Sequence, residues 1–297
     1  LKIWTMDEAG NKCADTDEII DTINVDLTAP TDLTIEIDGA SVVAGDSIAF
    51  DTFYQDSVTI VLGANCNISG LKSLQYQKVH AVSEYNSEGT WMDYPSAGIV
   101  VDPNEKFVLY FRAEDMAGNV SIIHSTGIVV DDKLPEGEVH APEIDIFPEE
   151  ANENGFYNGD VLVSLAVVDP RYIGQSASDN GDCSGLNRVT YRIYTTDTTA
   201  VEEGTLLDLS NGVTAGAVYD ADGLIQSWSG NITIHGNTFN SNTVRVELTA
   251  VDNAGNVRTT TTAAGQIRID MTNPTIDVSY SNNVSDSSSY FNADRTA

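Results

Sequence analysis

The sequence predicts an all-β protein made of β-sandwich domains in series. The phrase D-x-A-G-N occurs three times, at residues 7–11, 115–119 and 252–256. Each time, 16 to 19 residues after its first Asp, comes another Asp that stands four residues before a Pro. No segment shows a convincing 3.6-residue period, whereas several short runs alternate apolar and polar side chains. Repetition at this spacing indicates an array of like modules, and period-two alternation indicates strands.

The repeat spacing sets the domain boundaries. The prolines Pro30, Pro135 and Pro274 are 105 and 139 residues apart, which allows two complete units in a chain of 297 residues. We therefore expect complete units at 31–134 and 135–274, the last hairpin of a preceding unit at 1–30 and the start of a following unit at 275–297. The hairpin at the N-terminus has no sandwich to pack against, so we expect it to fray or to lean on a neighbour.

The strand before each repeated phrase is the clearest element. In the longer unit Val244, Val246, Leu248 and Ala250 would face inward, and the same register in the shorter unit points Phe107–Ala113 inward at alternate positions. The Gly of D-x-A-G-N can take a positive φ, and the leading Asp can accept a bond from a backbone N–H two residues on. The phrase therefore predicts a hairpin turn, followed by strands at 120–130 and 257–269.

A second repeated block lies upstream. Phe-Tyr pairs precede strand-like runs at 58–62 and 161–168, and Ser-Gly-Leu introduces further runs at 73–79 and 188–194. Short strands separated by turns at about ten-residue intervals are typical of a sandwich, and about seven strands fit the shorter unit. The longer unit has insertions at about 170–183 and 196–229, which we interpret as loops or a small extra hairpin.

These phrases resemble a known group of proteins. A strand followed by D-x-A-G-N, a second strand ending I-x-V-D or I-x-I-D, and then T-x-P is similar to the tandem Ig-like domains of large bacterial surface and secreted proteins, including HYR and OmpL47-type repeats. The Ser-Gly-Leu phrase and Gly89-Thr-Trp91 add to the likeness. The resemblance implies elongated, beads-on-a-string Ig-like sandwiches that serve as stalks, spacers or adhesive modules. The segment 196–229 is longer than that pattern needs.

Composition and motifs exclude several functions. With 45 acidic and 14 basic residues the net charge is −31, which argues against nucleic acid or an anionic membrane as a partner. No apolar run reaches the roughly 18–20 residues that cross a bilayer. The four His are scattered, and the phosphate-loop, nucleophile-elbow and zincin motifs do not occur. With neither a His cluster nor such a motif, we expect no catalysis within this chain. The three Cys fall one to a repeat, so we expect no disulfide within a complete unit.

The acidic linkers suggest a cation site. In an Ig-like sandwich the turn formed by D-x-A-G-N lies at the end where the chain enters, so each linker should approach the turn of the unit that follows. Oxygen ligands from Asp and Asn suit Ca²⁺, although turns and linkers use Asp and Asn without any ion. The candidate ligands are Asp131, Asp132, Asp169, Asp252, Asn253 and Asn256 at one junction and Asp26, Asp115 and Asn119 at the other.

Aromatic side chains suggest a second kind of site. Trp91 with Tyr94, and Trp228 with Tyr219 in the long insertion, could stack on sugars if their rings are exposed. A Trp in a sandwich more often belongs to the core, so the alternative is structural.

The sequence thus predicts a non-catalytic, extracellular segment of a bacterial cell-surface protein that acts as a stalk, spacer or adhesion module. Its expected partners are the neighbouring Ig-like repeats of the same chain and a host or matrix glycan or protein. The alternative is a pair of accessory, carbohydrate-binding domains of a secreted polysaccharide-active enzyme.

Overall fold

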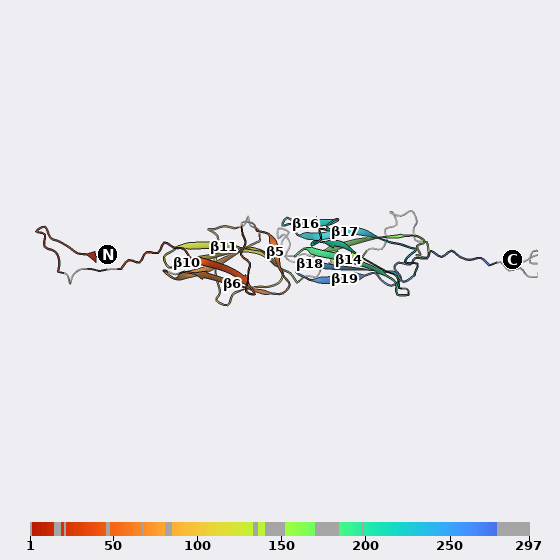
Figure 1. The fold of residues 1–297 in the computed structure, drawn as a ribbon, viewed down its shortest axis with the longest axis horizontal. Helices are drawn as coiled ribbons and strands as arrows, with labels where there is room; N and C mark the ends of the chain where they lie inside the picture. Colours follow the sequence, from red (N-terminus) through yellow and green to blue (C-terminus); the bar gives the residue numbers. More distant parts are fainter. Residues whose placement is uncertain are drawn as a thin grey trace, which may run out of the picture.

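A computed structural model describes residues 2–14, 19–20, 22–45, 48–66, 68–80, 85–132, 136–139, 152–169, 184–197 and 199–277. These residues contain strands and turns and no helix, which confirms the predicted all-β class. The strands form one small N-terminal sheet and two sandwiches of two sheets each. Figure 1 shows the sandwiches as two separate groups of strands, coloured orange to yellow and green to blue.

The N-terminal sheet is a pair of very short strands. β1 (Lys2–Ile3) pairs antiparallel with β2 (Ile19–Ile20), and an isolated bridge joins Met6 to Lys12 around the first repeated phrase. This is the expected hairpin at the start of the chain. Its predicted fraying stays a prediction.

The first sandwich has the strand pairing of an Ig-like fold. One sheet has the order β4-β3-β6-β9, with β4 (Ala40–Ser41), β3 (Thr31–Ile37), β6 (Val58–Asn65) and β9 (Ile99–Val101). The other has the order β5-β11-β10-β7-β8, with β5 (Phe50–Tyr54), β11 (Val120–Val130), β10 (Glu105–Asp115), β7 (Leu71–Val79) and β8 (Met92–Asp93). β5 runs parallel to β11 and the other pairs are antiparallel. The sheet that contains the parallel pair β5–β11 packs face to face with the antiparallel sheet, which is the expected two-layer arrangement.

The core of the first sandwich lies between its two sheets. As predicted, Phe107, Leu109, Phe111 and Ala113 of β10 are fully buried there. The outer face of β10 is buried as well, which the alternation did not predict. Val108 and Tyr110 on that face are covered by a second cluster, in which the ring of Tyr85 stacks on Tyr110 at 3.8 Å between centroids.

The second sandwich repeats this plan. One sheet has the order β12-β13-β17-β16, with β12 (Glu136–Val139), β13 (Val161–Val168), β17 (Ile225–Ile234) and β16 (Ala217–Tyr219). The other has the order β15-β14-β18-β19, with β15 (Val201–Asp208), β14 (Leu186–Tyr194), β18 (Arg245–Asp252) and β19 (Val257–Thr261). A parallel bridge between Tyr157 and Ile269 takes the place of the β5–β11 pair. β19 ends at Thr261, so it is shorter than the strand expected over 257–269.

The insertion 196–229 belongs to both sheets of the second sandwich. It supplies β15 at the edge of one sheet, β16 at the edge of the other, and the beginning of β17. It is therefore more than the loop or small hairpin that its Gly, Asp, Ser and Thr content indicates. The other predicted insertion, 170–183, lies outside the described residues.

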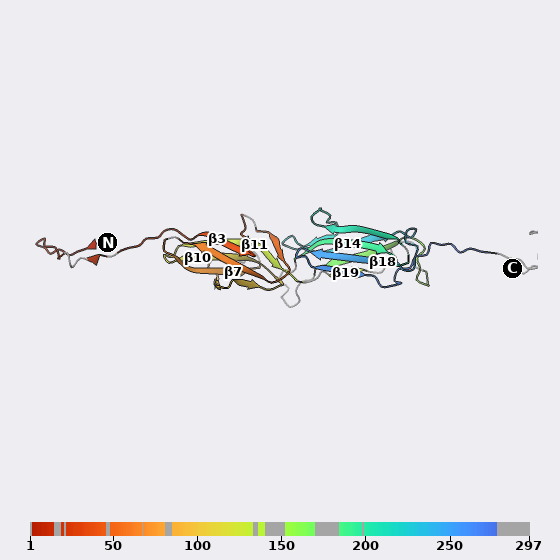
Figure 2. The ribbon, with the colours of Figure 1, turned by 60° about the horizontal axis from the view of Figure 1, so that its bottom comes forward.

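The two sandwiches contact one another where the chain passes from the first to the second. Figure 2 shows strands β3, β7, β10 and β11 in one group and β14, β18 and β19 in the next group along the longest axis. Direct contacts include the bond from the Gln55 side chain to Asn256 Oδ1, at 2.6 Å. The elongated, beads-on-a-string form of a longer array stays a prediction.

Two neighbouring residues of β18 test the alternation of its faces. Leu248 is 1% exposed in the core, and Leu248→Ala is expected to lower the unfolding free energy of the second sandwich by about 2–5 kcal/mol. Thr249→Ala, on the outer face, removes one cross-strand Thr pair with Thr259 and should cost about 1 kcal/mol or less. Urea unfolding followed by the fluorescence of the buried Trp228 measures both. Equal costs would contradict this assignment of inner and outer faces.

Candidate metal centres at the unit junctions

The repeated turn is closed by two bonds that its last residue donates to the side chain of its first. In the second sandwich Asn256 donates its backbone N–H to Asp252 Oδ1 and its side-chain amide to Asp252 Oδ2, both at 2.8 Å. The same pair of bonds joins Asn119 to Asp115 and Asn11 to Asp7. The Gly in each turn has a φ between 85° and 95°, which brings the chain back toward the Asp. The short bond to Oδ1 thus comes from the backbone N–H four residues on. The N–H two residues on, which the sequence predicted, also lowers the pKa of the leading Asp, as that of Ala9 does for Asp7 and that of Ala117 does for Asp115.

The same turn also holds the linker that enters the unit. The Asn256 amide donates to the carbonyl oxygen of Asp131 at 2.7 Å, and the Asn119 amide donates to the carbonyl oxygen of Asp26 at 3.1 Å. The linker carboxylates accept backbone bonds from the Ser of each Ser-Gly-Leu phrase, with Ser184 N–H on Asp131 and Ser69 N–H on Asp26. The two repeated phrases therefore cooperate in binding the preceding linker. The sequence did not predict this role of Ser-Gly-Leu.

Three carboxylates converge at the junction between the two complete units. Asp131 from the linker, Asp169 after β13 and Asp252 at the end of β18 each have an oxygen within 4.8 Å of the others. All three are buried, and Asp169 accepts the backbone N–H of Gly185 at 2.6 Å. Burial raises the pKa of Asp252 to about 6; the charge of Asp131 adds to this, and the bonds from Asn256 oppose it. Like charges held this close without water favour binding of a proton or a cation.

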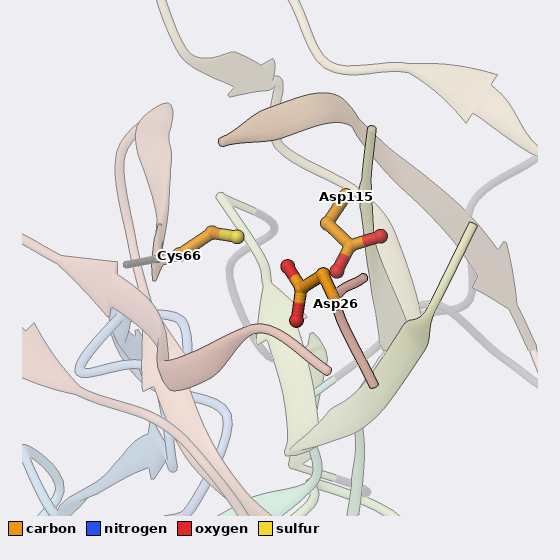
Figure 3. Close-up of side chains that lie close together, drawn as sticks. All are labelled: Asp26, Cys66 and Asp115. Carbon is orange, nitrogen blue, oxygen red and sulfur yellow. The ribbon is translucent and has the colours of Figure 1, made fainter. Parts of the chain in front are cut away.

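The N-terminal junction has the same geometry and a different donor set. Asp26 and Asp115 again approach one another, but the third group is the thiol of Cys66 (Figure 3). Cys66 follows directly after β6, as Asp169 follows directly after β13, so the thiol stands where the other junction has a carboxylate. Hydrogen bonds from Ser69 and Thr28 hold the pKa of Asp26 below its usual range. Burial raises the pKa of Asp115, but the bonds from Asn119 outweigh it and the pKa is lowered.

The structure brings most of the predicted cation ligands together. Asn119 and Asn256 lie beside the carboxylates, but their side-chain amides are donors to the linker carbonyl and to the turn Asp, so they position the ligands. Asn253 lies beside the cluster and is used elsewhere: its amide donates to Ser184 O, and its Oδ1 accepts from Asn187. Asp132 is exposed. Cys66 was missed, although its place after an alternating strand, like that of Asp169, was the available signal.

The chemistry of the donors suits different ions at the two junctions. Three buried carboxylates offer the oxygen ligands that Ca²⁺ prefers, and a cation there would offset both the burial of Asp252 and the smaller repulsion from Asp131, which together raise its pKa. Two carboxylates and a thiol make a poorer site for a hard cation, because sulfur prefers softer metals. Calcium binding at either junction stays a prediction.

The predicted aromatic platforms fare unequally. The Trp228 ring is 4% exposed in the second core, and its Nε1–H donates to Ala215 O at 2.7 Å, so the expectation that it offers a stacking face is wrong. The ring is buried because Trp228 points inward from β17, against the opposite sheet. Tyr219, on the edge strand β16, is exposed. Trp91 is half-buried against Tyr85 and Arg112, and Tyr94 packs on the first core.

The comparisons with known proteins show no family for this chain. No protein-family model and no curated protein matches this chain. Among solved structures, the chain is similar to one from a 1.5-MDa bacterial ice-binding adhesin, with 15% identity, a TM-score of 0.29 and coverage of 82% of this chain and 66% of that chain. It is also similar to an α-L-rhamnosidase of Streptomyces avermitilis complexed with L-rhamnose, with 11% identity, a TM-score of 0.22 and coverage of 80% and 24%. Within the described part of the chain, no helix has the length and hydropathy needed to cross a membrane.

The buried cluster predicts an unusual pH dependence in metal-free protein. Folded Asp252 has a pKa of about 6, against 3.8 for an ordinary Asp, so between these values the folded state binds more protons than the unfolded state. The stability of the second sandwich should therefore rise as the pH falls from about 7 to about 4.5. The carboxylates of the second sandwich with lowered pKa, Asp160, Asp197 and Asp208, have the opposite effect, but at lower pH. Melting in EDTA at several pH values measures this, and a melting temperature that falls over this range would contradict it.

Calcium is expected to stabilise the second sandwich through this cluster. At a free concentration of about 100 times the dissociation constant, an ion that binds only the folded state adds about 2.7 kcal/mol. The melting temperature should then rise on adding CaCl₂ to EDTA-treated protein, and Asp169→Asn should largely abolish the rise. Asp160→Asn is the matched control, because Asp160 precedes β13 at the other end of the same strand and binds His235 and Gly236. A melt that is unchanged by calcium would exclude the site.

Proposed function

We propose that this chain is a non-catalytic segment of a bacterial cell-surface protein, in which tandem Ig-like units serve as a stalk or spacer, or as an adhesion module. The observation that carries the proposal is the repeated junction. At both junctions the linker Asp is bound by the turn and the Ser-Gly-Leu phrase of the following unit. Each unit thus binds the linker that leaves the preceding unit. Such binding fixes successive units to one another, as an extended array requires.

The surface chemistry agrees with this role. A net charge of −31 makes neighbouring molecules repel one another and keeps such a segment dispersed outside the cell. A polyanion has no attraction for nucleic acid or for anionic lipid. The partners that we propose are the neighbouring Ig-like repeats and, for an adhesion module, a host or matrix glycan or protein.

One observation favours the alternative of an accessory domain in a secreted polysaccharide-active enzyme. The outer face of the second sandwich has an open hollow of about 440 Å³ between β14, β15 and β18. It is lined by Arg188, Arg192, Glu203 and Glu247 together with Tyr191 and three Thr. Charged groups and hydroxyls on a flat sheet are suited to the hydroxyl groups of a saccharide. Tyr191 is occupied in part by a bond to Glu202.

A single experiment separates the two functions. An antibody raised against this chain is applied to intact cells of the bacterium that encodes it, and the captured full-length polypeptide is identified by mass spectrometry. The stalk predicts labelling of intact cells and a polypeptide with a surface anchor. The accessory domain predicts recovery from the medium, in one polypeptide with a catalytic domain. Labelling only after the cells are permeabilised would contradict both.

A further inference from the structure

The insertion of the second sandwich carries its sheet toward the first sandwich. β17 pairs with β13 along the whole length of β13, from Val161 opposite Ile234 to Val168 opposite Ser227, and the Asp169 N–H continues the ladder to Gln226 O. In the first sandwich the corresponding strand β9 pairs only with Val58–Ile60 of β6. The extra length of β17 therefore reaches the end of the sandwich where the linker enters. The turn before it, at 220–223, must lie at that end too.

This turn has the backbone bonds of the repeated phrase, but Leu224 stands in place of its last Asn. The Leu224 N–H and the Asp222 N–H both donate to Asp220 Oδ1 at 2.9 Å, and Gly223 has a φ of 83°. Asp220 Oδ1 is thus used to close the turn. Its other oxygen, Oδ2, is left to face outward from the second sandwich.

The partner of Asp220 Oδ2 is a lysine of the first sandwich. Lys106 Nζ lies 3.3 Å from Asp220 Oδ2 and 2.5 Å from Asp222 Oδ2. Nζ also lies 4.6 Å from the centre of the Phe50 ring, which it faces from the start of β10. The side chains of Lys106 and Asp220 are 3% and 2% exposed. An ammonium this deeply buried is stable only with its counter-charges in place, so the contact is more than an exposed ion pair.

We propose that the Asp220–Gly223 turn is a docking element whose partner is the preceding Ig-like unit of the same chain, recognised by the ammonium of a lysine at the start of its β10 strand. The turn and the repeated D-x-A-G-N turn contact the first sandwich through different strands: Lys106 of β10 binds the former, and Gln55, just after β5, binds Asn256 of the latter. Two separate contacts besides the linker oppose bending and rotation at the junction. The docking element gives the insertion a role that a spacer of independent units does not require.

We call the contact of Lys106 with Asp220 and Asp222 the clamp, and it is specific to this pair of units. Lys106 stands nine residues before Asp115, and the residue nine before Asp252 is Thr243. Thr243 donates to Asp197 within its own sandwich at 2.7 Å and offers no ammonium to a following unit. A unit with an acidic turn of this kind therefore fits after the first sandwich and not after the second.

Residual dipolar couplings of backbone amides in the whole chain test the clamp. They are measured in EDTA, so that a cation at the Asp131 cluster does not hold the units together and a failure of the metal site leaves the result unaffected. Couplings of the two sandwiches in the wild-type chain are expected to fit one alignment tensor. In Lys106→Met they should fit two tensors of unequal magnitude, because the sandwiches then reorient separately.

Two further variants make the result decisive. Asp222→Asn weakens the shortest bond and leaves the turn intact, since the turn is closed by Asp220, so it should have the effect of Lys106→Met even if that variant folds poorly. Lys72→Met is the matched control, because it breaks the ion pair with Glu114 on the first sandwich, next to Asp115 and away from the junction between the two sandwiches. The clamp is overturned if the wild-type chain already needs two tensors. It is also overturned if Asp222→Asn still fits one, or if Lys72→Met separates the tensors equally.

Discussion

The connection between units depends on one carboxylate–amide pair, the Asp and Asn of the repeated turn. Asn256 donates twice to Asp252, which closes the hairpin, and its amide then donates its remaining hydrogen to the linker carbonyl of Asp131. One side chain thus fixes the turn and the entering chain together. Neither partner could be replaced by a shorter or an apolar residue without leaving a buried polar group unpaired, which costs about 1–3 kcal/mol. The spacing of the phrase is constrained for this reason.

The arrangement has an electrostatic consequence at the junction. Binding the linker through its backbone and its carboxylate places Asp131 beside the turn Asp and beside the residue that ends β13. Where that residue is Asp169, three carboxylates share a buried space and the pKa of Asp252 rises to about 6. Where it is Cys66, a thiol replaces the third carboxylate, and the effect of burial on Asp115 is outweighed by the bonds from Asn119, so the pKa of Asp115 stays below its usual value. The same backbone geometry therefore gives junctions with different affinities for protons and cations.

Much of the fold follows from sequence patterns, and the site follows in part. Alternation at Val244–Ala250 identified the inner face of β18, because the sheet is buried on one side there. It was less informative for β10, where Lys106, Val108 and Tyr110 are buried by residues distant in sequence. The approach of Asp131 to Asp169 and Asp252 could be predicted, since the entry end of a sandwich gathers those loops. The burial of Trp228 agrees with the structural alternative that the sequence offered. The thiol at Cys66 was not predicted, because its place beside the two carboxylates depends on how strands are aligned across the sheet.

Lys106 shows why the charge of a chain is a poor guide to its contacts. With 45 acidic residues and 14 basic ones, the average neighbour of any surface is an anion, so repulsion between successive units is the default. A buried cation at the junction reverses this locally, because the Coulomb attraction to Asp220 and Asp222 acts without screening by water. Because basic residues are few, an acidic turn has few side chains that it can bind, and each lysine therefore restricts where such a turn can dock. At this junction, the contact between the two sandwiches therefore depends on where one of the few basic residues is placed.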